Sequence, residues 1–271
     1  MHLTHRRVAL SAAILLGLAN LLSTVSAQAV PGGQLLGHRC RTYDPATNNE
    51  DTVAALVNTS KVPGAWCEVD AWTIADGTVI IWHDSTWGRV SDHSTLPPGV
   101  LPTDKVKDAT WQQVSQIRTT GGSPVATLGS MIDASAKQGV PLVVEVRNSI
   151  DSPAHWVSYA ESRGAQVRYY SSPRAGCTMP AQLDTLRTDG AIVGLKLGLS
   201  PCVITAAALQ AMGASFVTVR ADKITTTYTG DLAAHGVDAY ASGATALTAS
   251  TVLANGAAKL LVNRPRQAAS W

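Results

Sequence analysis

The sequence lacks the surplus of charge of one sign that is typical of proteins attracted to nucleic acid or anionic lipid. Its formal net charge is only +2 at pH 7. Two basic residues, Arg6 and Arg7, lie in an N-terminal segment that we expect to be removed. Without them, 21 − 2 = 19 basic residues balance 19 acidic ones. This balance gives no support for nucleic-acid binding or for electrostatic attachment to a membrane.

The sequence also lacks Cys-x-x-Cys and Cys-x-x-His pairs, which are the spacings typical of zinc sites. Its four cysteines are Cys40, Cys67, Cys177 and Cys202. An even number of cysteines in a chain expected to be exported favours two disulfides. Three connectivities are open from the count alone, and so is the alternative of four buried free thiols.

The N-terminus has the features of a targeting segment. Arg6 and Arg7 precede an apolar run over 8–22, and small residues at 26–29 offer a cleavage site. The run is too short for a membrane-spanning helix, so it predicts a secretory signal peptide over 1–29. An uncleaved anchor and a twin-arginine signal are the alternatives. We therefore expect a secreted mature chain, residues 30–271, with no stable membrane anchor and 271 − 29 = 242 residues.

Short apolar runs alternate with helical patterns along the mature chain. Helices are expected over 108–117, 127–137 and 153–163, among others. The expected strand centres are Leu35, Glu68, Val143, Val167, Val193, Phe216, Ala239 and Leu261. Strands that alternate with helices predict a parallel sheet covered on both faces. Eight of them at this length predict an α/β fold with a single (β/α)₈ TIM barrel, in one domain over 30–271.

Two carboxylates stand two residues apart in the second expected strand, at Glu68 and Asp70. Side chains alternate between the faces of a strand, so these two project from one face at ~6–7 Å from each other. Asp76 and Gly77 then predict a tight turn. The result is a β-hairpin extension after strand two, whose return run leads to His83.

Active sites of (β/α)₈ barrels lie at the carboxyl ends of the strands. His38 ends the first expected strand, and Glu145 and Arg147 lie near the end of the third. A carboxylate and an arginine in so apolar a run are costly to bury unpaired, and the barrel mouth is where they find partners. His38, Glu68, Asp70 and Glu145 are therefore expected to converge there.

The same strand order favours the pairs Cys40–Cys67 and Cys177–Cys202. Cys40 follows strand one and Cys67 lies in the neighbouring strand two, while the other two cysteines follow strands four and five. Each bond would fix a segment of the active-site rim.

These residue types indicate phosphoryl-transfer chemistry. Three carboxylates favour Mg²⁺ or Ca²⁺ over zinc. Two histidines, His38 and His83, can divide general-acid and general-base work near neutral pH. Arg39 and Arg147 offer forked donors suited to phosphate oxygens. A metal, two histidines and two arginines together favour a phosphodiester substrate.

The motifs resemble those of the glycerophosphodiester phosphodiesterase family. They are Gly37-His38-Arg39, Glu50-Asp51-Thr52, Glu68-Val69-Asp70, Asp76-Gly77, His83-Asp84, Thr127-Leu128 and Glu145-Val146-Arg147. The match is dense from His38 to Arg147, and the closing segment at Asn263 is also similar. Elsewhere the agreement is mainly in the alternation of strands and helices that is typical of the barrel.

The resemblance implies a divalent cation held by Glu68, Asp70 and Glu145, with His38 and His83 as the acid–base pair. It implies hydrolysis of glycerophosphodiesters to an alcohol and glycerol 3-phosphate. In that reaction a neighbouring hydroxyl of the substrate attacks phosphorus, and water then opens the cyclic phosphate.

Three positions depart from the family pattern. Cys40 stands where the family has glycine, Asp51 where it has asparagine, and Arg147 where lysine is usual. A disulfide at Cys40 would hold the loop in place of a tight glycine turn. The departures concern the substrate and the positioning of its phosphate rather than the metal.

Other interpretations stay open at this stage. A related barrel resembling sphingomyelinase D or a phospholipase would act on intact lipid headgroups. A glycosidase-like barrel would need two carboxyl groups ~5–9.5 Å apart but no metal or histidines, and a non-catalytic binding barrel would need none of these. Taken singly, His38 could be an ordinary loop histidine, and Lys196 could either reach the mouth or form a structural ion pair. The occurrence of the motifs in family order favours the diesterase.

Overall fold

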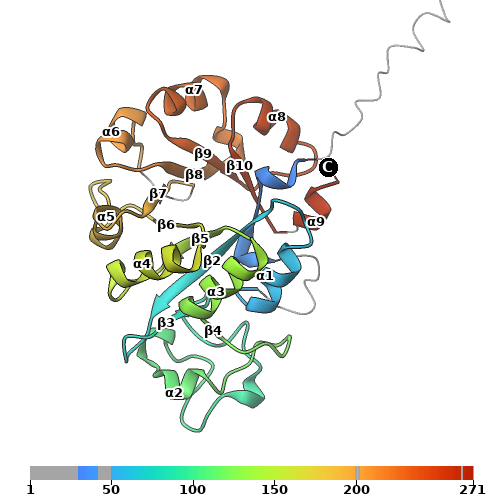
Figure 1. Cartoon of the computed structure of the whole chain (residues 1–271), viewed down its shortest axis with the longest axis vertical. Helices are drawn as coiled ribbons and strands as arrows, with labels where there is room; N and C mark the ends of the chain where they lie inside the picture. The colour runs from blue at the N-terminus through green and yellow to red at the C-terminus, as the bar shows by residue number, and fades with distance from the viewer. Residues whose placement is uncertain (1–29, 42–49, 199, 201, 264, 271) are drawn as a thin grey trace, which may run out of the picture.

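Eight parallel strands close into a barrel in the computed structural model, which describes residues 30–41, 50–198, 200, 202–263 and 265–270 (Figure 1). The strands are β1 (Leu35–Gly37), β2 (Trp66–Thr73), β5 (Leu142–Val146), β6 (Val167–Ser171), β7 (Ile192–Lys196), β8 (Phe216–Arg220), β9 (Asp238–Ser242) and β10 (Lys259–Val262). β1 pairs with both β2 and β10, which closes the ring. The predicted (β/α)₈ barrel is confirmed, and each expected strand centre lies in a strand. The predicted signal peptide, 1–29, lies outside the described residues.

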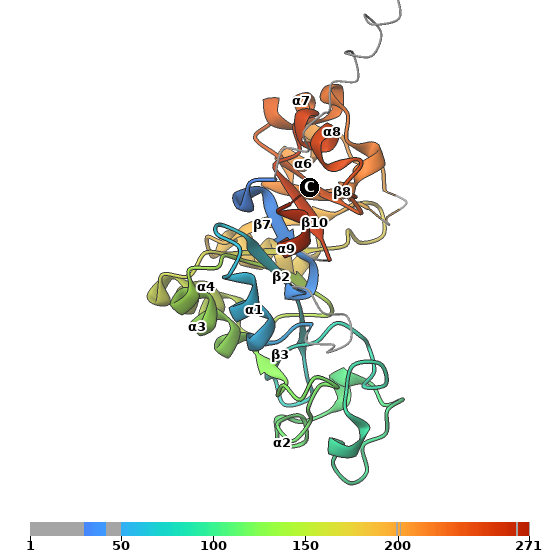
Figure 2. The same ribbon diagram turned by 90° about the vertical axis from the view of Figure 1, so that its right-hand side faces the viewer.

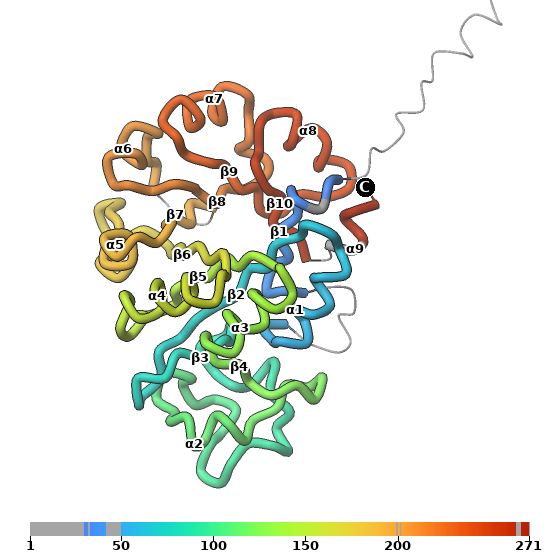
Figure 3. Tube along the Cα trace, in the orientation of Figure 1, coloured from blue at the N-terminus to red at the C-terminus, as the bar shows by residue number. Residues whose placement is uncertain are grey.

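Helices surround the barrel and cover the outer face of the sheet (Figure 3). They are α1 (Val53–Thr59), α3 (Leu128–Gln138), α4 (Pro153–Arg163), α5 (Ala181–Thr188), α6 (Ala206–Ala211), α7 (Thr226–Ala234), α8 (Ala249–Ala254) and α9 (Pro265–Ala268). Short 3-10 turns are η1 (Gly32–Gln34), η2 (His38–Cys40), η3 (His93–Thr95), η4 (Val106–Asp108) and η5 (Ala221–Lys223). Within the part of the chain that is described, none of the helices has the length and apolar character needed to cross a bilayer.

Local sequence signals explain where α3 begins and ends. The Thr127 side chain accepts a hydrogen bond from the Ser130 backbone N–H at 3.1 Å, which caps the first turn. Gly139 ends the helix with φ 64°, a left-handed conformation that glycine adopts without steric cost. The helix therefore matches the expected span over 127–137.

The predicted hairpin is present, and it carries an additional lobe. β3 (Val79–Ile81) pairs antiparallel with β2, and β4 (Ala126–Thr127) pairs antiparallel with β3. The intervening residues 82–125, here called the insertion lobe, project from one side of the barrel (Figures 1 and 2). The lobe has a hydrophobic core of its own around Trp82, Trp87 and Ile117.

One predicted helix is wrong in its bounds. In place of a helix over 108–117, α2 spans only Trp111–Val114, and Asp108 lies in η4. The side chain of Gln113 accepts a hydrogen bond from the Thr110 N–H at 2.9 Å, and this capping box fixes the start. The Trp111 N–H also donates to Asp76 Oδ2 at 2.6 Å, which ties the helix to the hairpin turn.

The barrel interior is filled by aromatic side chains. Phe216, the single phenylalanine of the chain, stacks on Tyr240 with ring centroids 4.7 Å apart. Gly194 faces this ring, and a Cβ there would lie 2.7 Å from it, so only glycine fits. Tyr170 completes the cluster and carries its hydroxyl toward the carboxyl ends of the strands.

Both predicted disulfides are present. The Cα atoms are 4.8 Å apart in Cys40–Cys67 and 5.4 Å apart in Cys177–Cys202. The first bond joins the loop after β1 to β2, and the second joins the loops after β6 and β7. The strand order therefore predicted the connectivity that the cysteine count left open.

Candidate active site

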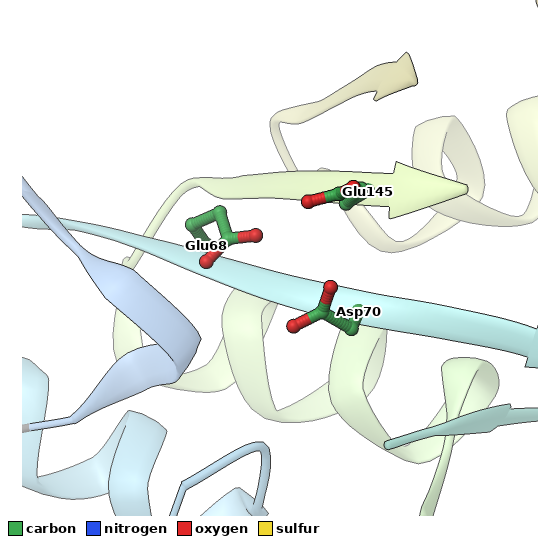
Figure 4. A group of neighbouring side chains, drawn as sticks. All are labelled: Glu68, Asp70 and Glu145. Atoms are coloured by element: carbon green, nitrogen blue, oxygen red, sulfur yellow. The ribbon is translucent and has the colours of Figure 1, made fainter. Parts of the chain in front are cut away.

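Three buried carboxylates form a cluster at the barrel mouth (Figure 4). Glu68 and Asp70 lie on β2, and Glu145 lies on β5, directly opposite Asp70 in the strand register. One oxygen from each residue lies within 4.8 Å of the others. The three residues are only 1%, 0% and 5% exposed. The cluster predicted from the sequence is therefore brought together.

The surrounding groups satisfy the two glutamates more fully than the aspartate. The Tyr170 hydroxyl bonds Glu68 Oε1 at 2.8 Å and Glu145 Oε2 at 3.2 Å. Lys196 Nζ bonds Glu145 Oε2 at 2.5 Å, and Arg147 Nη1 lies 3.0 Å from Glu145 Oε1. Asp70 Oδ1 is 3.4 Å from Arg147, whereas Asp70 Oδ2 is buried without a hydrogen-bond partner among the described residues.

The electrostatics of the cluster favour a cation. Burial, followed by the neighbouring charge of Glu68, raises the pKa of Asp70 well above its usual range. Burial acts in the same direction on Glu145, but Lys196 and Arg147 outweigh it and lower the pKa of that carboxyl. Hard carboxylate oxygens, one of them unpartnered, are the donors that Mg²⁺ and Ca²⁺ prefer. The three residues therefore fit a divalent cation.

A fourth carboxylate, Asp51, lies beside the cluster. Its Oδ1 accepts a hydrogen bond from the Asp70 N–H at 3.3 Å, and its Oδ2 is buried without a partner among the described residues. Burial, followed by the charges of Glu68 and Glu50, raises the pKa of Asp51 well above its usual range. This departure from the family pattern adds a fourth buried carboxyl group next to the cluster.

The raised pKa of Asp51 predicts how the metal-free protein responds to pH. The folded state holds this proton more tightly than the unfolded chain, so lowering the pH from the neutral to the mildly acidic range should stabilise the fold. Asp51→Asn removes the ionisable group and should raise the melting temperature at the higher pH by about 2–4 °C, the shift produced by about 1 kcal/mol. Thermal unfolding in EDTA at both pH values measures this. A lower melting temperature of the variant at the higher pH would contradict it.

The two predicted histidines lie on different loops of the mouth. His38 is in η2, after β1, and its Nδ1 lies 2.8 Å from Asn263 Oδ1. His83 follows β3, and its Nδ1 lies 2.6 Å from Asp84 Oδ1. Each ring therefore uses Nδ1 for its hydrogen bond to a neighbouring side chain. Burial lowers the pKa of His83 even though its bond to Asp84 acts in the opposite direction.

A network of charged side chains connects the insertion lobe to the loop after β1. Arg89 in the lobe donates to Asp84 Oδ2 at 2.7 Å and to Glu50 Oε1 at 2.5 Å. Glu50 is buried and also pairs with Arg39 and Arg41, at 3.1 Å each. In the sequence, Asp84 appears only as part of the His83-Asp84 motif, with no role of its own, and Arg89 belongs to none of the motifs. The local signal for Arg89 was its place five positions after Asp84. Its second partner, Glu50, is brought near only by the fold.

The arginines predicted to bind phosphate occupy different positions relative to the acids. Arg147 lies against Glu145 and Asp70, with its guanidinium 6.0 Å from the Trp72 ring centroid. Arg39 directs its backbone N–H to Glu68 Oε2 at 2.8 Å, while its guanidinium pairs with Glu50. Phosphate binding by Arg39 and by Arg147 stays a prediction. The Arg147 guanidinium lies at the carboxylate cluster, whereas that of Arg39 is paired with Glu50.

Lys196 and Tyr170 are site residues that the sequence left open or missed. Of the two alternatives for Lys196, both apply: its side chain reaches the mouth from β7, and it forms an ion pair there with Glu145. Tyr170 carried no motif, because its role follows from its place in the barrel core directly below two acids.

The barrel and the acidic cluster at its mouth define a (β/α)₈ protein with a candidate metal site. Comparison with known proteins gives the family. The model of the glycerophosphoryl diester phosphodiesterase family matches residues 38–172, a span that contains every residue predicted for the site. The chain belongs to this family of phosphoric diester hydrolases. The resemblance inferred from the motifs is thereby confirmed. A search of curated proteins found no match.

Solved structures share the fold at low sequence identity. A glycerophosphodiester phosphodiesterase from Parabacteroides distasonis is 13% identical, with a TM-score of 0.68, and the alignment covers 87% of this chain and 94% of that one. An Oleispira antarctica phosphodiesterase, solved with the product sn-glycerol-3-phosphate, is 15% identical, with a TM-score of 0.69 and coverage of 88% and 95%. A putative family member from Galdieria sulphuraria is 15% identical, with a TM-score of 0.69 and coverage of 89% and 96%.

Proposed function

We propose that this protein hydrolyses glycerophosphodiesters to an alcohol and glycerol 3-phosphate with the help of a divalent cation. The observation that carries the proposal is the cluster of Glu68, Asp70 and Glu145, which gathers three buried carboxylates within 4.8 Å at the barrel mouth. Membership of the family supports the substrate class. The product complex of the Oleispira enzyme agrees with it.

The three carboxylates would hold Mg²⁺ or Ca²⁺, and Asp70 Oδ2 is the oxygen that lacks another partner among the described residues. When bound, such a cation stabilises negative charge on phosphoryl oxygens and lowers the pKa of a coordinated hydroxyl group. Arg147, at the edge of the cluster, supplies a forked donor for the phosphate oxygens. Lys196 and Tyr170 keep Glu145 oriented toward Glu68.

The histidines carry the protons in this proposal. One ring accepts the proton of the substrate hydroxyl that attacks phosphorus, and the other protonates the leaving alcohol. Water then opens the cyclic phosphate, with the two roles exchanged. The bonds from Nδ1 of His38 to Asn263 and from Nδ1 of His83 to Asp84 hold the two rings, and Nε2 is the atom that would exchange protons with the substrate.

A panel of substrates tests the proposed activity. Purified protein should release glycerol 3-phosphate from glycerophosphocholine and glycerophosphoethanolamine, and should act less on sphingomyelin and lysophosphatidylcholine. The products are measured side by side by an enzyme-coupled assay for glycerol 3-phosphate and by mass spectrometry. Turnover of sphingomyelin and lysophosphatidylcholine alone would contradict this proposal and favour the alternative below.

The alternative is a sphingomyelinase D-like or phospholipase-like enzyme that acts on intact lipid headgroups. Two nearly fully exposed apolar side chains favour it: Val203 is 95% exposed and Leu247 is 92% exposed. They lie in the loops after β7 and β9, at the same end of the barrel as the acids. If lipid is the substrate, Val203→Ser with Leu247→Ser should reduce activity on vesicles but leave activity on soluble diesters unchanged.

We also propose that the protein acts outside the cytoplasm, after removal of residues 1–29. Arg6, Arg7 and the apolar run over 8–22 support this, and so do two disulfides, which persist in oxidising compartments. N-terminal sequencing of the protein recovered from culture medium should begin at Val30. A protein that stays with the cells and still carries Met1 would contradict this proposal.

A further inference from the structure

Two consecutive residues of the loop after β1 have left-handed backbone conformations, although neither is glycine. Arg39 has φ 57° and ψ 34°, and Cys40 has φ 51°. A side chain in this conformation crowds the following carbonyl group, so it persists only where its surroundings hold it. The turn begins at His38. Whatever holds Arg39 and Cys40 therefore also sets the direction in which His38 leaves the barrel.

The Cys40–Cys67 disulfide joins this turn to β2. Gly37 and Cys67 are partners in the register of β1 and β2, so the turn starts directly beside Cys67. Both cysteines are fully buried, and their Cα atoms are 4.8 Å apart. Cys67 immediately precedes Glu68. The bond thus ties the His38 turn to the strand that carries two of the three clustered acids.

Backbone groups of the turn also form hydrogen bonds with residues in and around the site. The Arg39 N–H donates to Glu68 Oε2 at 2.8 Å. The Arg39 carbonyl accepts from the Asp51 N–H at 2.8 Å, and the Cys40 carbonyl accepts from the Thr59 hydroxyl at 3.4 Å. A return of either residue to negative φ would redirect these groups. Glu68 would then lose one of its two hydrogen-bond partners among the described residues, since Tyr170 bonds the other oxygen.

We propose that the Cys40–Cys67 disulfide is a positioning device of the active site, and not only a source of stability. It holds Arg39 and Cys40 in the left-handed turn and thereby keeps His38 and Glu68 in place relative to each other. The inference rests on the proposed function, because it gives the bond a part in hydrolysis. Glycine at position 40 would do the same work without a bond, since glycine adopts positive φ without steric cost.

The second disulfide offers a matched control. Cys177–Cys202 spans 25 residues of sequence and Cys40–Cys67 spans 27, so the two bonds restrict the unfolded chain to a similar degree. Cys177–Cys202 joins the loops after β6 and β7. In the strand order around the barrel, these two strands are not neighbours of β1, which leads into the His38 turn. Loss of either bond should lower the melting temperature similarly, whereas only one loss should disturb the turn.

Three double variants test the proposal: Cys40→Ala with Cys67→Ala, Cys40→Gly with Cys67→Ala, and Cys177→Ala with Cys202→Ala. The measurements are the melting temperature, kcat and KM with glycerophosphocholine, and the Kd for Ca²⁺ or Mg²⁺ by calorimetry. The first variant should lower kcat at least about tenfold and weaken metal binding several-fold. The glycine variant should regain most of the lost kcat without regaining thermal stability. The control should keep kcat within about twofold of the wild type, because its bond fixes a part of the rim that carries none of the predicted site residues.

Two results would overturn the proposal. One is a kcat within about twofold of the wild type in the first variant, and the other is no gain from glycine over alanine at position 40. If the alanine pair does not fold, the control protein serves instead, since its single remaining disulfide is Cys40–Cys67. Reduction with a phosphine, verified by thiol alkylation, should then lower kcat, and reoxidation should restore it; unchanged activity would count against the proposal. An inactive wild type would refute the proposed function, while the metal Kd would still test the turn.

Discussion

Removal of divalent cations with EDTA should abolish hydrolysis of glycerophosphodiesters, and addition of Mg²⁺ or Ca²⁺ should restore it. The physical reason lies in the three buried carboxylates Glu68, Asp70 and Glu145, which lie within 4.8 Å of one another. A phosphodiester carries negative charge, and it would be repelled by these acids unless a cation lies between them. Steady-state rates before and after chelation, together with the metal content of the purified protein, measure the effect.

The corresponding substitution is Glu68→Ala with Asp70→Ala. A bound cation supplies several kcal/mol of transition-state stabilisation, which corresponds to a loss of about a thousandfold in kcat/KM. The variant should also lose measurable metal binding by calorimetry. Arg163→Ala is a suitable control, because Arg163 pairs with Asp133 on the surface between α3 and α4. Full activity in EDTA, or in the double variant, would rule out the metal mechanism.

Replacement of either histidine by alanine should cost about 10²–10⁴-fold in kcat, the usual contribution of a general acid or base. His38 and His83 reach the mouth from different loops and hold separate hydrogen bonds, to Asn263 and Asp84. Both side chains are partly exposed, so their removal should leave the folded state intact. Rates and circular dichroism of His38→Ala and His83→Ala check the two parts of this expectation.

The neighbour of His83 provides a graded comparison. Asp84→Asn keeps the shape of the side chain but removes the charge that orients the His83 ring, so we expect a smaller loss of about ten- to a hundredfold in kcat. His93→Ala is the matched control, since His93 bonds the Gly88 carbonyl on the surface of the insertion lobe. A near wild-type rate in His38→Ala or in His83→Ala would show that the replaced histidine takes no part in the mechanism.

Much of the site could be predicted from the sequence because its acids lie on neighbouring strands of a regular barrel. Glu68, Asp70 and Glu145 belong to β2 and β5, which are adjacent in the sheet although a lobe separates them in the chain. The period of two along a strand puts Glu68 and Asp70 on one face. A parallel barrel then leaves one end at which these side chains meet. The disulfides followed from the same strand order.

Residues whose role depends on a partner from elsewhere could not be predicted. Tyr170 shares its hydroxyl between Glu68 and Glu145 because it lies in the barrel core directly below them. Arg89 bridges Asp84 and Glu50 because the insertion lobe folds back toward the loop after β1. No local pattern encodes such distances, since long side chains reach partners that only the packing of the lobe brings near.

The sequence by itself determined the alternation of strands and helices, the motifs of the mouth and the chemistry they favour, because these follow from local periodicity and residue type. The tertiary structure decided which carboxylate oxygens lack a hydrogen-bond partner among the described residues, how Glu50 pairs with three arginines, and that Arg39 and Cys40 are held left-handed. These features arise only when β1, β2 and the insertion lobe are packed together. Burial and charge pairing depend on neighbours that are distant in the chain.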